Sequence, residues 1–182
     1  MLLVVKQFVL LCQQKCLLVL GLILCTVLTS ACSESDDKQA FRDALVEKAL
    51  NDETYQQGEA FLAEYIQQPD ALRLPSGVLY RVIASGSKDS PSPRLADTVV
   101  VKYEGKLVNG SVFDRRLDTP IKFPVAGVVK GWQHALFAMH VGDVWEVVVP
   151  SKLAYGAKSP SREIPANSVL IFSIELLEVI ER

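Results

Sequence analysis

Residues 98–114 read Thr-Val-Val-Val-Lys-Tyr-Glu-Gly-Lys-Leu-Val-Asn-Gly-Ser-Val-Phe-Asp. Alternate side chains of a strand point to the same face, and the alternate residues from Val99 to Tyr103 are all apolar or aromatic. This pattern predicts a β-strand over residues 98–108. Asn109-Gly110 follows, and both residue types tolerate the positive φ angles that a type I′ turn requires. We therefore expect a hairpin whose second strand starts directly after the turn.

The segments around this hairpin continue the pattern of short strands. Apolar runs predict strands at residues 78–83, 144–149 and 169–180, each bounded by glycine, proline or polar residues. Residues 131–139 have a helical period instead, with Trp132 and two further apolar residues on one face. The prediction is an α+β fold, in which an antiparallel sheet packs against one short helix.

Residues 39–73 are expected to form one or two helices ahead of the sheet. Apolar side chains recur at helical spacing around Phe41 and again around Phe61. Asn51-Asp52 would separate or cap the two segments, and Pro69 would end the second. Packing on the domain and pairing with another chain both remain open for these helices.

The first 31 residues have the composition of a signal peptide. Lys15 precedes a long apolar run, which ends in the small residues Ser30 and Ala31 before Cys32. Residues 28–32 resemble a bacterial lipobox, which implies acylation of Cys32, a polar tether over residues 32–38 and, with Ser33 next, sorting to the outer membrane. Cleavage after Ala31 to give a soluble periplasmic protein and retention as a membrane anchor are the alternatives.

Charge and cysteine content exclude several functions. Without the first 32 residues, which carry only two lysines, 17 basic residues face 21 acidic ones, a formal charge of −4. The sequence contains no basic patch of the kind that nucleic-acid binding requires. All four cysteines fall within the first 32 residues, so no disulfide is expected in the globular part. His134 and His140 are the only histidines, and neither a metal site nor a cofactor is predicted.

Six short motifs occur in order along the second half of the chain. They are Val-Lys-Tyr-Glu-Gly at 101–105, Gly-Ser-Val-Phe-Asp at 110–114, Val-Val-Lys-Gly-Trp at 128–132, Ala-Tyr-Gly at 154–156, Ile-Pro-Ala-Asn-Ser at 164–168 and Leu-Ile-Phe at 170–172. With these motifs, residues 74–182 resemble the FKBP-type peptidyl-prolyl cis/trans isomerases. The stretches that begin at Gly58 and Leu74 are similar to the macrophage infectivity potentiator branch.

This resemblance implies a sheet half-wrapped around the short helix, with the site between them. It implies catalytic roles for Asp114, Tyr155 and Tyr103, and substrate-binding roles for Phe113, Phe123, Val128, Val129, Trp132, Ile164 and Phe172. Two rim positions depart from the family pattern: Pro160 replaces a frequent histidine, and Glu163 replaces an apolar residue. These departures concern substrate preference and drug affinity rather than the pocket floor.

The expected activity is isomerisation of prolyl bonds in exported proteins of the bacterial envelope. The barrier of about 18–20 kcal/mol arises from amide resonance, and an apolar aromatic pocket suits the twisted, less hydrated bond. The expected partners are proline-containing clients, tacrolimus- or rapamycin-type macrolides and, through the lipid, a membrane. The branch dimerises through long N-terminal helices, and oligomerisation stays open for the shorter segment here. The alternatives are a peptide-binding chaperone and a structural or adhesion lipoprotein.

Overall fold

The computed structural model describes residues 38–39, 41–42, 44–45, 48 and 52–181. The chain divides into two units, Met1–Lys48 and Ala49–Arg182, and the described residues of the first unit are helical. The expected signal peptide, Cys32 and nearly all of the tether lie outside the described residues. Within the described part of the chain, no helix is both long and apolar enough to cross a membrane.

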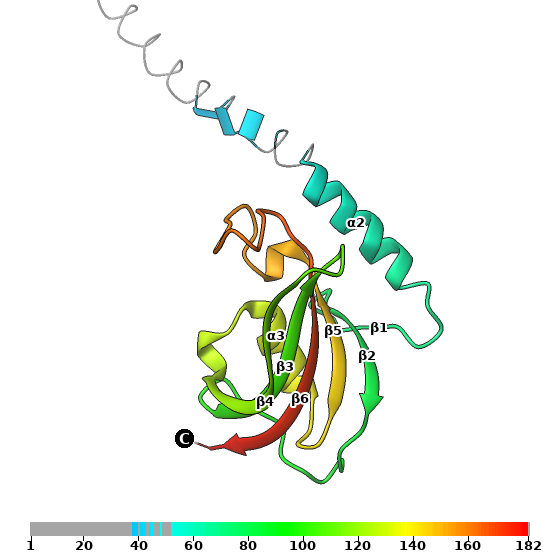
Figure 1. Ribbon diagram of the computed structural model, residues 1–182, viewed down its shortest axis with the longest axis vertical. Helices are drawn as coiled ribbons and strands as arrows, with labels where there is room; N and C mark the ends of the chain where they lie inside the picture. The colour runs from blue at the N-terminus through cyan, green and yellow to red at the C-terminus, as the bar shows by residue number, and fades with distance from the viewer. Residues whose placement is uncertain (1–37, 40, 43, 46–47, 49–51, 182) are drawn as a thin grey trace, which may run out of the picture. The chain divides into compact units, whose positions relative to one another are not determined.

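The second unit is built on a six-stranded antiparallel sheet (Figure 1). Its strands lie in the order β1-β2-β5-β6-β3-β4. Their bounds are Leu72–Arg73 for β1, Leu79–Ala84 for β2, Thr98–Leu107 for β3, Val112–Pro124 for β4, Val144–Val149 for β5 and Leu170–Ile180 for β6. The predicted antiparallel α+β fold is confirmed, and the strands predicted for β2, β3, β5 and β6 differ from these bounds by at most one residue at an end.

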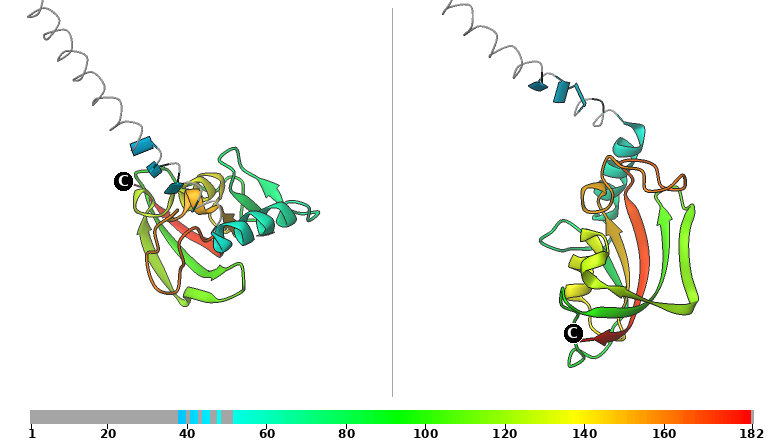
Figure 2. Two further views of the ribbon diagram at one scale, coloured as in Figure 1. Left: turned by 90° about the horizontal axis from the view of Figure 1, so that it is seen from above. Right: turned by 90° about the vertical axis from the view of Figure 1, so that its left-hand side faces the viewer.

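The strand alternation gives the sheet two separately packed faces. On one face, helix α3 (Lys130–Ala138) lies in the curve of the sheet, as the views in Figures 1 and 2 show. Val147, Leu170 and Phe172 belong to the core on this side. Their neighbours Val148 and Ile171 point to the other face, because successive side chains of a strand alternate.

Helix α2 (Glu53–Tyr65) packs against that second face. Asp52 caps it, because its Oδ1 accepts the Thr54 N–H at 2.8 Å and the Tyr55 N–H at 3.3 Å. Its buried Tyr65 packs with Leu79, Val148, Val169 and Ile171. The expected helix after Asn51-Asp52 is therefore present, and it packs on the domain.

An ion pair and a hydrogen bond tie the end of α2 to the sheet. Arg81 of β2 donates from Nη2 to Glu146 Oε1 of β5 at 2.7 Å, and the Tyr65 hydroxyl donates to the same oxygen at 3.0 Å. Burial first, and then the charge of Glu146, raise the pKa of Tyr65 well above 10, so this phenol stays protonated. The Glu146 carboxylate thus accepts hydrogen bonds from the neutral Tyr65 phenol and from the Arg81 guanidinium, and these bonds hold the end of α2 against the sheet.

The turn between β3 and β4 differs from the prediction of a type I′ hairpin. Gly110 has a φ of 85°, but Asn109 is not among the residues with positive φ, and a type I′ turn requires positive values at both central positions. The Gly110 N–H donates to Leu107 O at 2.9 Å, and the Asn109 side chain accepts the Ser111 N–H at 3.0 Å. The asparagine thus stabilises the loop through its side chain rather than through a left-handed backbone.

The second strand of the hairpin is present as predicted, but its length and the existence of β1 were not predicted. Strand β1 has only two residues, both exposed, so it carries no periodic pattern. Strand β4 extends for 13 residues, and its pairing with β3 jumps from Val101↔Ile121 to Tyr103↔Arg116. The irregular segment between these pairs interrupts the alternation of side chains by which a strand is recognised in a sequence.

Gly131 allows α3 to approach β5 closely. A Cβ there would lie 2.2 Å from Val149 Cγ1. We expect Gly131→Ala to lower the free energy of unfolding by about 1–2 kcal/mol, because overpacking of about 1–3 kcal/mol exceeds the helix-propensity gain of up to about 1 kcal/mol. Urea unfolding measures this, with Gly127→Ala as the control, whose Cβ would meet only Pro124 Cβ at 4.0 Å. Equal unfolding free energies for the two variants would contradict the packing argument.

Candidate active site

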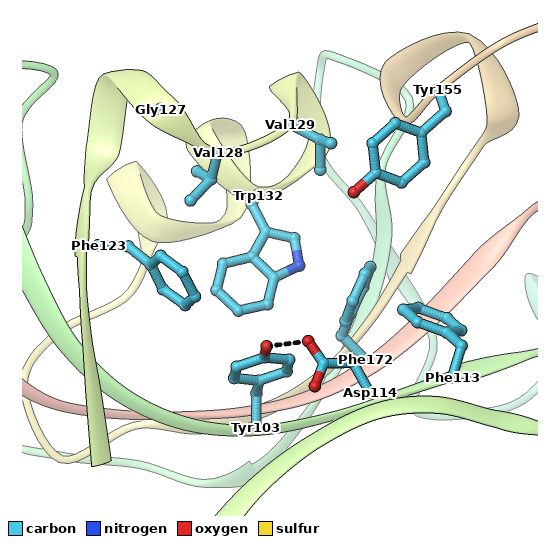
Figure 3. Close-up of a pocket in the computed structure, with 10 residues that line it drawn as sticks. All are labelled: Tyr103, Phe113, Asp114, Phe123, Gly127, Val128, Val129, Trp132, Tyr155 and Phe172. Atoms are coloured by element: carbon cyan, nitrogen blue, oxygen red, sulfur yellow. Dashed lines mark hydrogen bonds between the residues drawn. The ribbon is translucent and has the colours of Figure 1, made fainter. Parts of the chain in front are cut away.

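A cavity of about 290 Å³ opens between α3, the sheet and two loops (Figure 3). This volume lies near the lower end of the range of about 300–1,000 Å³ typical of small-molecule sites. Most of its lining is aromatic or aliphatic, and one charged side chain reaches it. The lining residues are Tyr103, Phe113, Asp114, Phe123, Gly127, Val128, Val129, Trp132, Tyr155 and Phe172.

Trp132 of α3 lies at the centre of an aromatic cluster. The ring centroids of Tyr103 and Phe172 are each 5.2 Å from that of the indole, and both rings stand nearly perpendicular to it. Phe123 meets the same indole at 6.0 Å and 89°. Edge-to-face contacts of this kind each add roughly 0.5–1.5 kcal/mol beyond burial. They also fix the plane of the indole, which Figure 3 shows at the base of the cavity.

Asp114 is the charged group at the edge of the cavity. It belongs to β4 and its side chain is 41% exposed, whereas Tyr103 of neighbouring β3 is buried. The Tyr103 hydroxyl donates to Asp114 Oδ2, and the Arg115 N–H donates to Asp114 Oδ1 at 2.8 Å. Arg116 Nη1 lies 3.6 Å from the same Oδ1. The carboxylate is therefore held in one orientation by the Tyr103 phenol, the Arg115 N–H and the nearby Arg116 guanidinium.

Burial raises the pKa of the Tyr103 phenol well above 10. The hydrogen bond to Asp114 and the charge of that carboxylate raise the pKa further, while the Arg116 guanidinium lowers it. Tyr103 thus remains a neutral hydrogen-bond donor, and Asp114 has an acceptor oxygen committed to it. This pair supplies a fixed negative charge at the edge of an apolar cavity.

Tyr155 contributes a second phenol from a loop. It follows the short 3₁₀ helix η2 (Ser151–Leu153) and is 42% exposed. The loop turns at Gly156, whose φ is 60°, and the Asn167 N–H donates to Gly156 O at 2.7 Å. Figure 3 shows the Tyr155 hydroxyl directed into the cavity. It is placed to donate a hydrogen bond to a bound carbonyl.

The structure brings together all of the predicted site residues except two. Ile164 is buried in the core and is not among the lining residues, and Cys32 lies outside the described part of the chain. Pro160 and Glu163 are exposed and do not line the cavity. In the described ranges, no group of three or more His, Cys, Asp or Glu side chains is placed to hold a metal ion.

Two glycines contribute to the site although neither was predicted from the sequence to be a site residue. Gly127 lines the cavity itself. Gly105 of β3 leaves room for two aromatic walls, since a Cβ there would lie 2.6 Å from Phe113 Cζ and 2.9 Å from Phe172 Cε1. The glycine that ends the 101–105 motif was the available signal. Its partners are distant in sequence, so its role becomes visible only in the folded sheet.

The fold and the cavity together define an α+β protein with an aromatic pocket between its antiparallel sheet and its short helix. Residues 90–177 match the family model described as FKBP-type peptidyl-prolyl cis-trans isomerase. The chain is 35% identical over 162 residues to the macrophage infectivity potentiator of Trypanosoma cruzi, covering 88% of this chain and 80% of that protein. The chain therefore belongs to the FKBP-type peptidyl-prolyl cis-trans isomerase family.

Two further similarities agree with this assignment. The outer membrane protein MIP of Legionella longbeachae is 40% identical over 145 residues, covering 79% of this chain and 61% of that protein. A crystal structure of a peptidyl-prolyl cis-trans isomerase from Pseudomonas syringae matches with a TM-score of 0.66 and 32% identity, over 70% of this chain and 94% of that one. The chain spans 54–61% of the length of the first curated relatives that it matches.

The Asp114→Asn substitution tests the coupling between Asp114 and Tyr103. We expect it to lower the pKa of Tyr103, because it removes the negative charge, but to leave that pKa above 10, because burial is the largest cause. Tyrosine ¹³Cζ chemical shifts followed against pH measure it residue by residue. Tyr65, which depends on Glu146 instead, should keep its pKa and serves as the internal control.

The raised pKa also links Tyr103 to stability. Since the folded-state pKa exceeds the unfolded one, the neutral phenol stabilises the fold below about pH 10, and this contribution is lost as the pH rises towards the folded-state pKa.

A Tyr103 pKa that is unchanged in Asp114→Asn would show that the carboxylate does not act on the phenol.

Proposed function

We propose that this chain is a peptidyl-prolyl cis/trans isomerase that acts on exported proteins in the bacterial cell envelope. The observation that carries the proposal is the aromatic cavity based on Trp132, with Asp114 and Tyr155 at its rim. Family membership supports the same activity. Its substrates are polypeptide segments that contain proline.

The cavity suits the chemistry of prolyl isomerisation. The reaction makes and breaks no covalent bond, so it is accelerated by binding the twisted imide more tightly than the planar one. Twisting removes the amide resonance that creates a barrier of about 18–20 kcal/mol. The twisted carbonyl is less amide-like and less strongly hydrated, and a water-poor aromatic site favours it over the planar form. Trp132, Tyr103 and Phe172 pack around the proline ring.

The two polar groups at the rim act on the carbonyls next to the proline. The Tyr155 hydroxyl donates a hydrogen bond to a substrate carbonyl and orients the chain. The Asp114 carboxylate places a fixed negative charge near the carbonyl carbon of the rotating bond, where the charge distribution changes most. Such preorganised charges act strongly in a low-dielectric site, since they need no reorientation during the reaction.

The envelope location rests on the N-terminal sequence and on relatives. We infer that residues 1–31 direct export and that Cys32 is acylated, which anchors the domain to the outer membrane through the polar tether over residues 32–38. The name of the Legionella relative, an outer membrane protein, agrees with this location. Release as a soluble periplasmic protein is the alternative. Macrolides of the tacrolimus and rapamycin type are expected to occupy the cavity as inhibitors.

Substitution of the rim groups tests the proposed activity. We expect Asp114→Ala and Tyr155→Phe each to lower kcat/KM by about ten-fold, because losing about 1.4 kcal/mol of transition-state stabilisation slows a reaction ten-fold. A protease-coupled or NMR exchange assay on Ala-X-Pro-Phe peptides measures this. Wild-type protein that accelerates none of the peptides would exclude the isomerase.

Matched controls separate the rim from general effects. Tyr80→Phe removes a phenol that stacks on Trp145 and does not line the cavity, and Asp89→Ala removes an exposed loop carboxylate. Both should keep wild-type kcat/KM. Suppression of client aggregation that survives Asp114→Ala, without measurable catalysis in the wild type, would favour the chaperone alternative.

The Cys32→Ser substitution tests the anchor. In cells of a Gram-negative host, we expect labelled fatty acid to enter the wild-type protein and not the variant, because acylation needs the cysteine sulfur. Globomycin should cause the unprocessed wild-type precursor to accumulate. After cell fractionation, we expect the variant to be absent from the outer-membrane fraction in which the wild-type protein is found. Wild-type protein without label that is recovered in the soluble periplasmic fraction would establish the soluble alternative.

A further inference from the structure

One wall of the cavity comes from a segment without regular backbone pairing. It runs from the 3₁₀ helix η1 (Val125–Gly127) to the start of α3, and its residues Gly127, Val128 and Val129 line the cavity. Val128 and Val129 have extended backbones, with ψ angles of 165° and 152°. Their peptide groups therefore need partners outside a sheet ladder or a helix.

The Gln133 side chain supplies partners for two of these groups. Its Nε2 donates to Val128 O at 3.0 Å and to Ala126 O at 3.3 Å. Its Oε1 accepts a hydrogen bond from Lys130 Nζ at 3.2 Å. Gln133 is only 5% exposed, so this amide is almost completely removed from water, and its two N–H groups are both committed to the wall.

The position of Gln133 on α3 gives these bonds their consequence. Gln133 directly follows Trp132, and consecutive helical residues point about 100° apart, so one helix turn supplies the cavity base with Trp132 and braces the wall with Gln133. A peptide group is planar, so holding the Val128 carbonyl also fixes the orientation of the peptide that joins Val128 to Val129. The two valine side chains that face the cavity start from the ends of this peptide.

We propose that Gln133 is a positioning residue of the isomerase. Its amide holds the wall segment 126–129 at the distance from Trp132 at which a twisted prolyl ring fits, without touching the substrate. This inference rests on the proposed function. Because a loosened wall binds planar and twisted forms less selectively, loss of the amide lowers kcat more than it raises KM.

Two variants remove the donor in different ways. Gln133→Glu keeps the shape and the acceptor for Lys130 but replaces the Nε2 donor, and Gln133→Met keeps the length without charge. Lys130→Met is the matched control, because it removes the bond to Oε1 and leaves both Nε2 bonds in place. We expect about ten-fold lower kcat in both Gln133 variants with KM within about two-fold, and wild-type values in Lys130→Met.

A spectroscopic readout separates positioning from general destabilisation. The methyl resonances of Val128 and Val129 should shift in the Gln133 variants and not in Val148→Ala at matched stability, because Val148 packs on the α2 face of the sheet, away from the wall. Folded Gln133 variants with wild-type kcat would overturn the proposal, as would an equal loss of kcat in Lys130→Met. If both Gln133 variants fail to fold, Gln133 is a determinant of folding and the proposal is wrong. Inactive wild-type protein would instead refute the proposed function.

Discussion

Helix α3 approaches strand β5 to a distance that only a glycine allows, since a Cβ on Gly131 would meet Val149 Cγ1 at 2.2 Å. The next residue is Trp132, so this backbone contact sets the depth at which the indole lies between α3 and the sheet. At that depth the rings of Tyr103, Phe123 and Phe172 stand nearly perpendicular to the indole, with ring centroids 5.2–6.0 Å from it. The size and shape of the cavity thus follow from a contact that lies behind it, in the core.

The parts of the site come from elements that differ in burial and in their place in the fold. The base and the braced wall belong to α3 and the segment before it, where packing is dense and the Gln133 amide is buried. Asp114 comes from β4, which is an edge strand of the sheet and pairs only with β3. Tyr155 comes from an exposed loop. The buried α3 and the segment before it thus determine the shape of the apolar cavity. The two polar groups lie where an incoming polypeptide can reach them.

The sequence predicts most of this arrangement because strand alternation and helical period are local signals. The strand from Thr98 and the helix around Trp132 follow from those signals, and the residues that converge on the cavity follow from the resemblance of the ordered motifs to a known family. Long-range contacts carry no such signal: the closeness of Gly105 to Phe113 and Phe172, and the bonds of Gln133 to a loop, exist only after folding. Asn109 misled the turn prediction because its side chain replaced the backbone conformation expected of it.

The alternation of β5 and β6 also separates two interiors within one small domain. Val147 and Phe172 face α3, and their chain neighbours Val148 and Ile171 face α2, where Arg81 and Glu146 close the helix end. Side chains on opposite faces share a strand but no packing partners, so their energetic effects are expected to add independently. The α2 side is therefore free to diverge in evolution, or to be redesigned as an attachment surface, while the chemistry on the α3 side stays intact.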